Sequence, residues 1–132
     1  MLQELLINDY TCQSGQIITT NLSYELVGRP LHSAPIILIN HALTGNSNVG
    51  GTNGWWKTLL GPEKTIDTNH FTVLCFNIPG NGYDGKIFNN SEQFCINDIA
   101  ALFLLGLKKL KIQQLFAIIG GSIGGAIAWE MT

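Results

Sequence analysis

The sequence carries little charge. Only 12% of its 132 residues are Asp, Glu, Lys or Arg, against roughly 25% in an average soluble domain, while 45% are hydrophobic. The net charge of -2 and the pI near 5.8 give no electrostatic basis for binding nucleic acid or an anionic membrane surface. The small basic group of Lys108, Lys109 and Lys111 is interpreted as the charged end of a helix, where cations suit the helix dipole.

Cysteines and long apolar runs are also scarce. The three cysteines are odd in number and form no C-x-x-C pair, which argues against a disulfide framework or a zinc site and favours a reducing compartment. The first residues lack the basic region of a signal peptide, and no stretch approaches the ~20 apolar residues of a membrane helix. We therefore expect a cytoplasmic protein with no metal and no membrane partner.

Short apolar runs predict a sheet. The alternating runs at the start predict antiparallel strands over residues 5–7, 16–19 and 22–27, with a turn at Ser14-Gly15. Continuous apolar runs of the kind buried on both faces of a parallel sheet occupy residues 36–39, 71–76 and 115–119. The sequence thus predicts an α/β fold with a mostly parallel sheet and an antiparallel N-terminal start.

Helices are predicted between and after these strands. Apolar residues at spacings of three and four predict a helix from Ile96 to Leu110, with Asn97 or Asp98 capping its start. A second helix is predicted over residues 126–131, and a short one over residues 55–60. The stretch from 40 to 54 is rich in Gly, Asn, Ser and Thr and is predicted to be a loop at the end of a buried strand.

A glycine-serine motif joins the last strand to the last helix, with the sequence Gly120-Gly121-Ser122-Ile123-Gly124-Gly125. It matches G-x-S-x-G, in which a sharp turn lifts one serine Oγ clear of the sheet while the glycines let strand and helix approach. The dinucleotide-binding pattern G-x-G-x-x-G is not matched, because Ser122 stands where its second glycine is required. The phosphate-binding loop is not matched either, because Ala126 stands where its lysine is required. A plain glycine-rich turn is the remaining alternative to a nucleophilic Ser122.

An acyl-transfer serine needs two N–H donors for the oxyanion that forms on its substrate. One is the backbone N–H of the residue after the nucleophile, here Ile123, and the other comes from the loop after an earlier core strand. The segment from Asn40 to Gly45 follows the first buried strand, and Leu43 is our candidate for the second donor.

The base and the acid of a catalytic triad are not evident. His41 lies in the candidate loop, but in this kind of fold the base follows the nucleophile in the order Ser, acid, His. We therefore interpret His41 as a histidine that shapes the loop. Asp98 and Glu130 are the acids nearest to the motif, and neither follows a later strand. The triad acid and histidine are expected beyond Thr132, so that residues 1–132 form the N-terminal portion of one incomplete core domain.

Several motifs occur together in one order, namely His41-Ala42-Leu43-Thr44-Gly45, Gly54-Trp55-Trp56, Gly61-Pro62, Ile66-Asp67-Thr68, Phe76-Asn77 and Gly120-Gly121-Ser122-x-Gly124-Gly125. This series, over about residues 20 to 132, resembles the homoserine O-acetyltransferases of methionine biosynthesis, which have the α/β-hydrolase fold. The loop over residues 78–85 departs from the family pattern, and Ile123 and Ala126 stand where methionine is common.

The resemblance implies an acyltransferase that moves an acetyl group from acetyl-CoA to the hydroxyl of L-homoserine. Ser122 would be acylated, with the backbone N–H groups of Leu43 and Ile123 holding the oxyanion. Its partners would be these small molecules, with acetyl-CoA a substrate rather than a bound cofactor, and the parent enzyme is expected to be a homodimer. Two alternatives stay open: a serine esterase of the same fold, and an inactive fragment that lacks the triad Asp and His.

Overall fold

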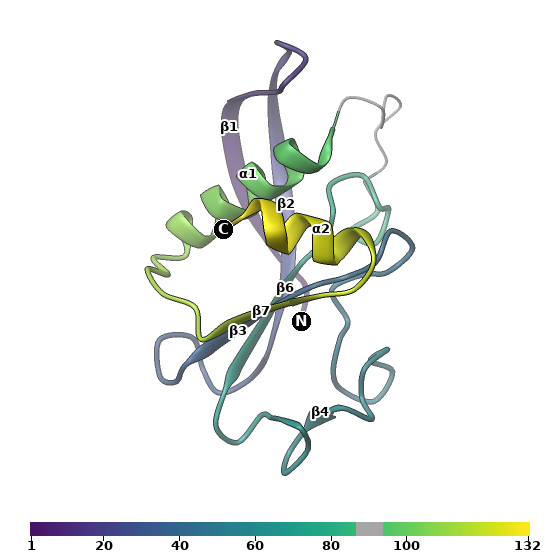
Figure 1. The fold of residues 1–132 in the computed structure, drawn as a ribbon, viewed down its shortest axis with the longest axis vertical. Helices are drawn as coiled ribbons and strands as arrows, with labels where there is room; N and C mark the ends of the chain where they lie inside the picture. The colour runs from purple at the N-terminus through teal and green to yellow at the C-terminus, as the bar shows by residue number, and fades with distance from the viewer. Residues whose placement is uncertain (87–93) are drawn as a thin grey trace.

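A five-stranded mixed sheet forms the centre of the protein (Figure 1). The computed structural model describes residues 1–86 and 94–132. In spatial order the strands are β1 (Gln3–Thr11), β2 (Ile17–Gly28), β6 (Thr72–Phe76), β3 (Ile36–Asn40) and β7 (Ala117–Gly120). β1, β2 and β6 pair antiparallel in succession, whereas β3 runs parallel to both β6 and β7. The predicted antiparallel start and parallel core strands are therefore both present.

The N-terminal strands are longer than the sequence pattern predicts. The two runs predicted over residues 16–19 and 22–27 form one continuous 12-residue strand, β2. The polar residues between them stay in the sheet because Thr20 and Asn21 pair with Ile7 and Leu6 of β1. Further along, β2 pairs with β6 as well, and Tyr24 has a partner on each side. Pairing to two neighbours thus overrides a local interruption of the apolar pattern.

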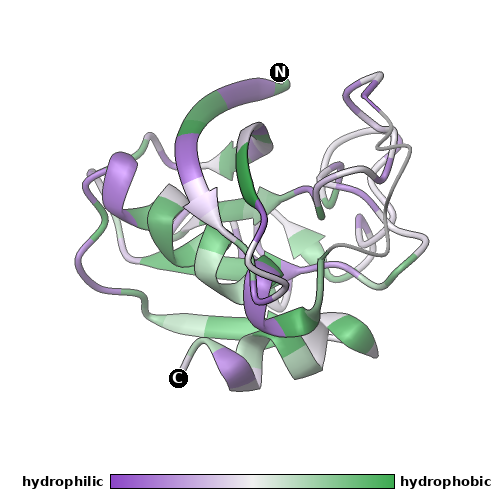
Figure 2. Cartoon of the chain, turned by 90° about the horizontal axis from the view of Figure 1, so that it is seen from above, coloured by the Kyte–Doolittle hydropathy of each residue, from purple (hydrophilic) through white to green (hydrophobic). Residues whose placement is uncertain are grey.

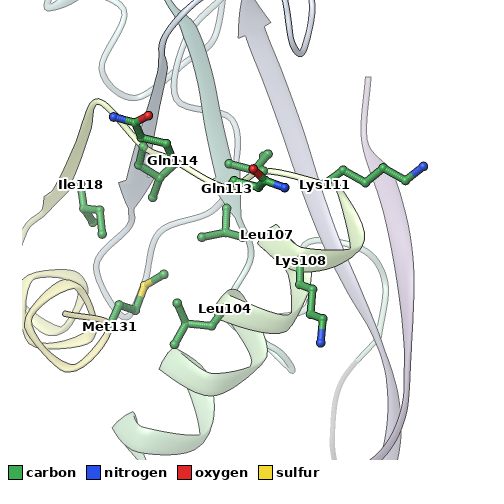
Figure 3. A pocket seen from close by; sticks show the side chains of 10 residues that line it. Leu104, Leu107, Lys108, Lys111, Gln113, Gln114, Ile118 and Met131 are labelled. Atoms are coloured by element: carbon green, nitrogen blue, oxygen red, sulfur yellow. The ribbon is translucent and has the colours of Figure 1, made fainter.

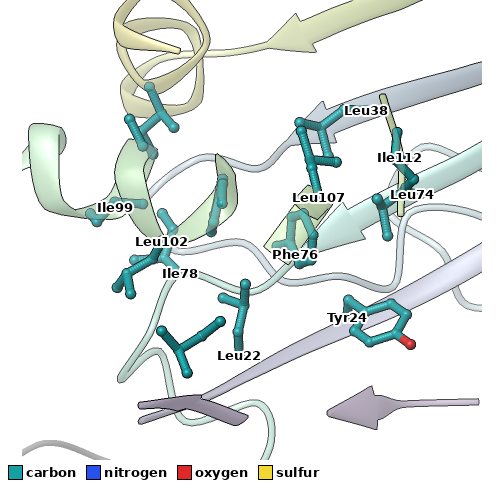
Figure 4. Close-up of a cluster of buried hydrophobic side chains, with 14 of the residues drawn as sticks. Leu22, Tyr24, Leu38, Leu74, Phe76, Ile78, Ile99, Leu102, Leu107 and Ile112 are labelled. Atoms are coloured by element: carbon teal, nitrogen blue, oxygen red, sulfur yellow. The ribbon is translucent and has the colours of Figure 1, made fainter. Parts of the chain in front are cut away.

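Two helices cover one face of the sheet, α1 (Ile96–Lys109) and α2 (Ile123–Glu130), as Figure 1 shows. α1 connects β6 to β7, which run in the same direction, by the kind of crossover that is right-handed as a rule, and α2 packs beside α1. The main hydrophobic core lies beneath them (Figure 4), where Leu38 and Phe76 from the sheet meet Leu102, Phe103 and other residues of α1. Ring contacts such as Phe76 on Phe103, with centroids 5.2 Å apart, add to this packing.

The opposite face of the sheet is covered by the long connection between β3 and β6. Its Val49, Leu60 and Ile66 pack on Ile37 and Ile39, which alternate along β3 with residues that face the helices. The connection holds only two short strands, β4 (Leu60–Gly61) and β5 (Ile66–Asp67). The short helix predicted over residues 55–60 is wrong, since this segment forms turns whose N–H groups bond to local carbonyls.

The helix α1 begins at Ile96, as predicted, but its cap is a different residue. Cys95 is the N-cap residue, so neither Asn97 nor Asp98 occupies that position. Asp98 is the third helical residue, and its carboxylate accepts a hydrogen bond from the backbone N–H of Cys95 at 3.1 Å. A carboxylate there satisfies a donor at the helix start and suits the helix dipole. At the other end, Lys108 and Lys109 lie in the last turn of α1, as predicted.

The strand β7 forms one edge of the sheet. All four of its residues are half-buried, whereas β3 and β6 are fully buried. Near it, the side chains of Phe116 and Trp129 are 66% and 82% exposed. Figure 2 shows hydrophobic residues on the central strands and on α2. In the two described ranges, no helix has the length and apolar character to cross a membrane.

Candidate active site

Ser122 lies in a tight turn between β7 and α2. Its backbone has φ 56 and ψ -126, a strained conformation for a residue with a side chain. The helix starts at the next residue, Ile123, which is earlier than the position 126 predicted from the sequence. Ser122 is exposed. The turn therefore presents the serine side chain at the N-terminal, positive end of α2, which is the geometry that a nucleophile elbow requires.

Glycines make this turn possible because other backbone groups occupy the space of a side chain. A Cβ at Gly124 would lie 2.1 Å from the carbonyl oxygen of Asn40, at the end of β3. A Cβ at Gly120 would lie 2.2 Å from the carbonyl oxygen of Gly124. Both distances are far below van der Waals contact. The two glycines thus bring α2 against the end of its own strand and against the neighbouring strand.

The loop after β3 emerges beside Ser122. Asn40 pairs with Gly120 in the parallel register of β3 and β7. The two segments that follow these strands therefore leave the sheet side by side, at the C-terminal ends of the parallel strands. Three residues further on, Leu43 lies in a turn closed by a 2.8 Å hydrogen bond from the N–H of Gly45 to the carbonyl of Ala42. The structure therefore brings the segment with Leu43 to the same end of the sheet as Ser122, at the C-terminal ends of the parallel strands.

The backbone N–H groups of Leu43 and Ile123 have no protein acceptor within the described part of the chain. For Ile123 this follows from its place at the first helical position, where the N–H cannot bond within the helix. The first turn of α2 also carries no acidic side chain. Two free backbone N–H donors lie at the C-terminal ends of neighbouring strands, near a serine and a helix N-terminus. Such donors could stabilise a negatively charged oxygen.

His41 is built into the structure rather than free to act as a base. The side chain is only 1% exposed, and its Nε2 accepts a 3.0 Å hydrogen bond from the backbone N–H of Ile78. Since Nε2 is an acceptor, Nδ1 carries the proton and donates to the carbonyl of Ala42 at 2.6 Å. Burial lowers the pKa of His41, partly offset by that hydrogen bond. The interpretation of His41 as a loop-shaping residue agrees with these contacts.

The other histidines lie at the opposite end of the parallel strands from Ser122. His32 and His70 precede β3 and β6, at the N-terminal ends of strands whose C-terminal ends lie near Ser122. The nearby acids have structural partners as well. Asp98 accepts hydrogen bonds from Tyr10 and Gln13 at 2.8 and 2.9 Å, and Glu130 accepts one from Asn97. None of the chain's histidines, all of which are described, is therefore placed as a base for Ser122.

A prominent hollow lies away from Ser122 (Figure 3). It is lined by Leu104 and Lys108 near the C-terminal end of α1 and by Met131 beyond the C-terminal end of α2. Ser122 stands at the other end of α2. This hollow is therefore separate from the serine turn.

A buried set of polar side chains, which the sequence analysis missed, supports the loop after β3. Asn77 is 2% exposed and lies directly after β6, where its side chain bonds to Ser23 and Ser47. Asn40 is the last residue of β3 and is also buried, with an Oδ1 that has no partner among the described residues. The available signal was an asparagine that directly follows a run of apolar residues in both cases.

Comparison with known proteins agrees with this geometry. A family model described as the alpha/beta hydrolase fold matches residues 35–132, which include the sheet core, the loop after β3 and the serine turn. The chain belongs to the α/β-hydrolase fold family. The fold class predicted from the sequence is thereby confirmed.

More specific similarity points to one group within this fold. The chain is 35% identical to the homoserine O-acetyltransferase of Methanococcus vannielii over 95% of its own length, but it spans only 30% of that relative. The solved homoserine O-acetyltransferase of Bacillus anthracis matches 98% of the chain at a TM-score of 0.86 and 27% identity, and the chain covers 42% of that structure. The resemblance drawn from the sequence motifs is confirmed.

The same fold is shared with a hydrolase. A solved esterase matches 97% of the chain at a TM-score of 0.80 and 25% identity, and the chain covers 43% of it. The α/β-hydrolase scaffold thus occurs with both acetyl transfer and ester hydrolysis among the chain's structural neighbours.

Proposed function

We propose that the protein carrying this chain is a homoserine O-acetyltransferase. The observation that carries the proposal is the strained backbone of Ser122 at the N-terminus of α2, beside the loop that holds Leu43. It is supported by similarity along nearly the whole chain to relatives with that name. Since the chain spans less than half of these relatives, the activity is assigned to the whole protein. The proposal includes a cytoplasmic role in methionine biosynthesis.

The reaction proceeds by two displacements. Ser122 Oγ attacks the thioester carbonyl of acetyl-CoA and gives its proton to a base, and the carbonyl oxygen becomes an oxyanion held by the N–H groups of Leu43 and Ile123. The C–S bond then breaks, and coenzyme A leaves with a proton as the free thiol. The homoserine hydroxyl attacks the acetyl-serine, the bond to Oγ breaks, and Ser122 regains its proton.

The base is a histidine outside residues 1–132. Both ring nitrogens of His41 are used in hydrogen bonds, and His32 and His70 lie at the N-terminal ends of the parallel strands, away from Ser122. An imidazole from elsewhere in the protein, oriented by an acid, would approach Ser122 from the open side of the serine turn.

A serine esterase is the second candidate, favoured by the similarity to the solved esterase. Its first displacement would follow the same course on an ester, with an alcohol in place of coenzyme A as the leaving group, and water would replace homoserine as the acceptor. The difference that the experiment can detect is what removes the acetyl group from Ser122. An acyl-enzyme that persists in water and is discharged by L-homoserine identifies the transferase.

The test uses the protein expressed from its complete reading frame. After brief mixing with acetyl-CoA alone, intact-protein mass spectrometry should show the mass of one added acetyl group, and initial-rate plots against both substrates should be parallel. Ser122→Ala should abolish labelling and reduce turnover by several orders of magnitude. Ser14→Ala, at an exposed hairpin serine, serves as the control. Full turnover with intersecting rate lines and no labelled protein would exclude an acyl-serine.

A further inference from the structure

The loop after β3 is tied to the loop after β6 at three points. His41 accepts a hydrogen bond from the N–H of Ile78 at 3.0 Å, and the carbonyl of Gly45 accepts one from Asn81 Nδ2 at 3.3 Å. Ser47 donates its N–H to Asn77 Oδ1 at 2.8 Å. These ties lie on both sides of Leu43, so the turn that carries its N–H is held at each end.

We propose that Asn77 and Asn81 are positioning residues that set the place of the Leu43 N–H relative to Ser122. This inference rests on the proposed function, in which that N–H binds the oxyanion. Neither side chain touches the reacting atoms, and each acts through the backbone of residues 42–47.

The Asn77 side chain is fixed because all of its hydrogen-bonding capacity is used. Its Nδ2 donates to Ser23 Oγ at 3.0 Å and to Ser47 Oγ at 2.9 Å. Its Oδ1 accepts from the N–H of Ser47 and from Asn81 Nδ2, the latter at 3.1 Å. A backbone N–H can only donate, so the amide cannot be turned over without losing a bond. Asn77 therefore forms a rigid platform under the loop.

A carboxylate extends this platform. Ser47 Oγ donates to Glu25 Oε2 at 2.6 Å, which fixes the serine hydroxyl as a donor to Glu25 and an acceptor from Asn77. Glu25 lies on β2, opposite Cys75 of β6. The loop after β3 is thus anchored through Ser47 to β2 and to the residue that follows β6.

Asn81 connects the platform to the turn itself. Its Nδ2 reaches both Asn77 Oδ1 and the carbonyl of Gly45, while its Oδ1 accepts from the N–H of Tyr83 at 3.0 Å within its own loop. Gly45 in turn closes the turn around Leu43 through its bond to Ala42. Asn81 therefore transmits the position of the buried amide to the turn that carries the candidate oxyanion donor.

The Asn81→Asp variant tests this role selectively. A carboxylate keeps the bond from Tyr83 and loses both Nδ2 donations, so the loop after β6 retains its own turn. In the protein from its complete reading frame, we expect the rate of Ser122 acetylation to fall by about 10–100-fold, because small misplacement of an oxyanion donor is costly. The affinity for acetyl-CoA, taken from the dependence of the acetylation rate on acetyl-CoA concentration, should stay unchanged. The Tm should fall by only a few degrees, because two partly buried hydrogen bonds are lost. Asn69→Asp, at an exposed turn, is the matched control.

A double-mutant cycle separates positioning from general weakening. Leu43→Pro removes the donor itself at a turn position that accepts proline. If Asn81 acts through the Leu43 N–H, Asn81→Asp should have little further effect on acetylation in the Leu43→Pro background. Independent, multiplying effects would overturn the proposal. Should Asn81→Asp fail to fold, Asn81→Ser decides the question in the same cycle.

The outcomes also distinguish this inference from the proposed function. If the unaltered protein forms no acetyl-serine, the proposed function fails and the inference falls with it. If the unaltered protein is acetylated and Asn81→Asp is acetylated at the same rate, only the positioning role is refuted. A loss of acetyl-CoA affinity in parallel with the rate, together with a large drop in Tm, would likewise refute it, since that pattern reports a structural role alone.

Discussion

Replacing Gly124 by alanine should displace the serine turn. The new Cβ would lie 2.1 Å from the carbonyl oxygen of Asn40 and 2.7 Å from that of His41, both backbone atoms that cannot rotate away. Ordinary contact begins near 3.4 Å, so the end of β3 and the start of α2 must separate by about 1.3 Å at this point. Ser122 and the loop with Leu43 belong to the two sides of that contact.

Two effects of different size should follow. Overpacking of this kind costs about 1–3 kcal/mol in the free energy of unfolding, although alanine within a helix would otherwise stabilise it by about 0.5–1 kcal/mol. A shift of about 1 Å between the nucleophile and an oxyanion donor should reduce the acetylation rate by about 100-fold. Urea denaturation measures the first effect, and the time course of acetyl labelling measures the second. Gly124→Val should be more severe in both.

Neighbouring glycines supply graded controls. A Cβ at Gly121 meets no atom within 4 Å, and its φ is not in the left-handed region. A Cβ at Gly125 lies 3.1 Å from the carbonyl oxygen of Gly120. Gly121→Ala should therefore be nearly neutral, and Gly125→Ala intermediate. If Gly124→Ala retained the labelling rate and stability of Gly121→Ala, the close approach of α2 to β3 would be refuted.

Three further predictions concern stability. Because burial lowers the pKa of His41, the unfolded chain takes up a proton near pH 6.5 that the folded chain does not. Stability should therefore fall by up to about 1.4 kcal/mol per pH unit below 6.5, and urea denaturation of His41→Gln should lose this dependence. Burial would raise the pKa of Asp98, but hydrogen bonds from Tyr10, Gln13 and Cys95 outweigh it and lower that pKa. The stabilisation of the fold by the Asp98 carboxylate is therefore complete above the unfolded pKa of about 3.9 and is lost as pH falls through the folded value. Asp98→Ala should cost about 2 kcal/mol in the free energy of unfolding at pH 7, and Tyr10→Phe should cost less in the same assay. Residues 1–132 alone should self-associate through the exposed side of β7 and α2, and sedimentation should show less association for Trp129→Lys. A chain that is monomeric at all concentrations would contradict this prediction.

The sequence by itself determined the features that depend on local pattern. Continuous apolar runs located β3 and β6, because both faces of these strands are buried in the sheet. A similar run located β7, whose residues are half-buried at the edge of the sheet. Spacing of three and four located α1. The serine turn could also be predicted, since only glycines at fixed distances from Ser122 allow strand and helix to approach so closely.

Only the tertiary structure decided what depends on distant partners. Thr20 and Asn21 continue β2 because β1 pairs with them, and residues 55–60 form turns because their apolar side chains already pack on the sheet without a helix. The role of His41 is decided by the N–H of Ile78, 37 residues away. The side chain of Asn77 makes four hydrogen bonds with three residues from separate segments, Ser23, Ser47 and Asn81. Hydrogen bonds between loops leave no periodic trace in sequence, since they depend on which strand ends the sheet brings together.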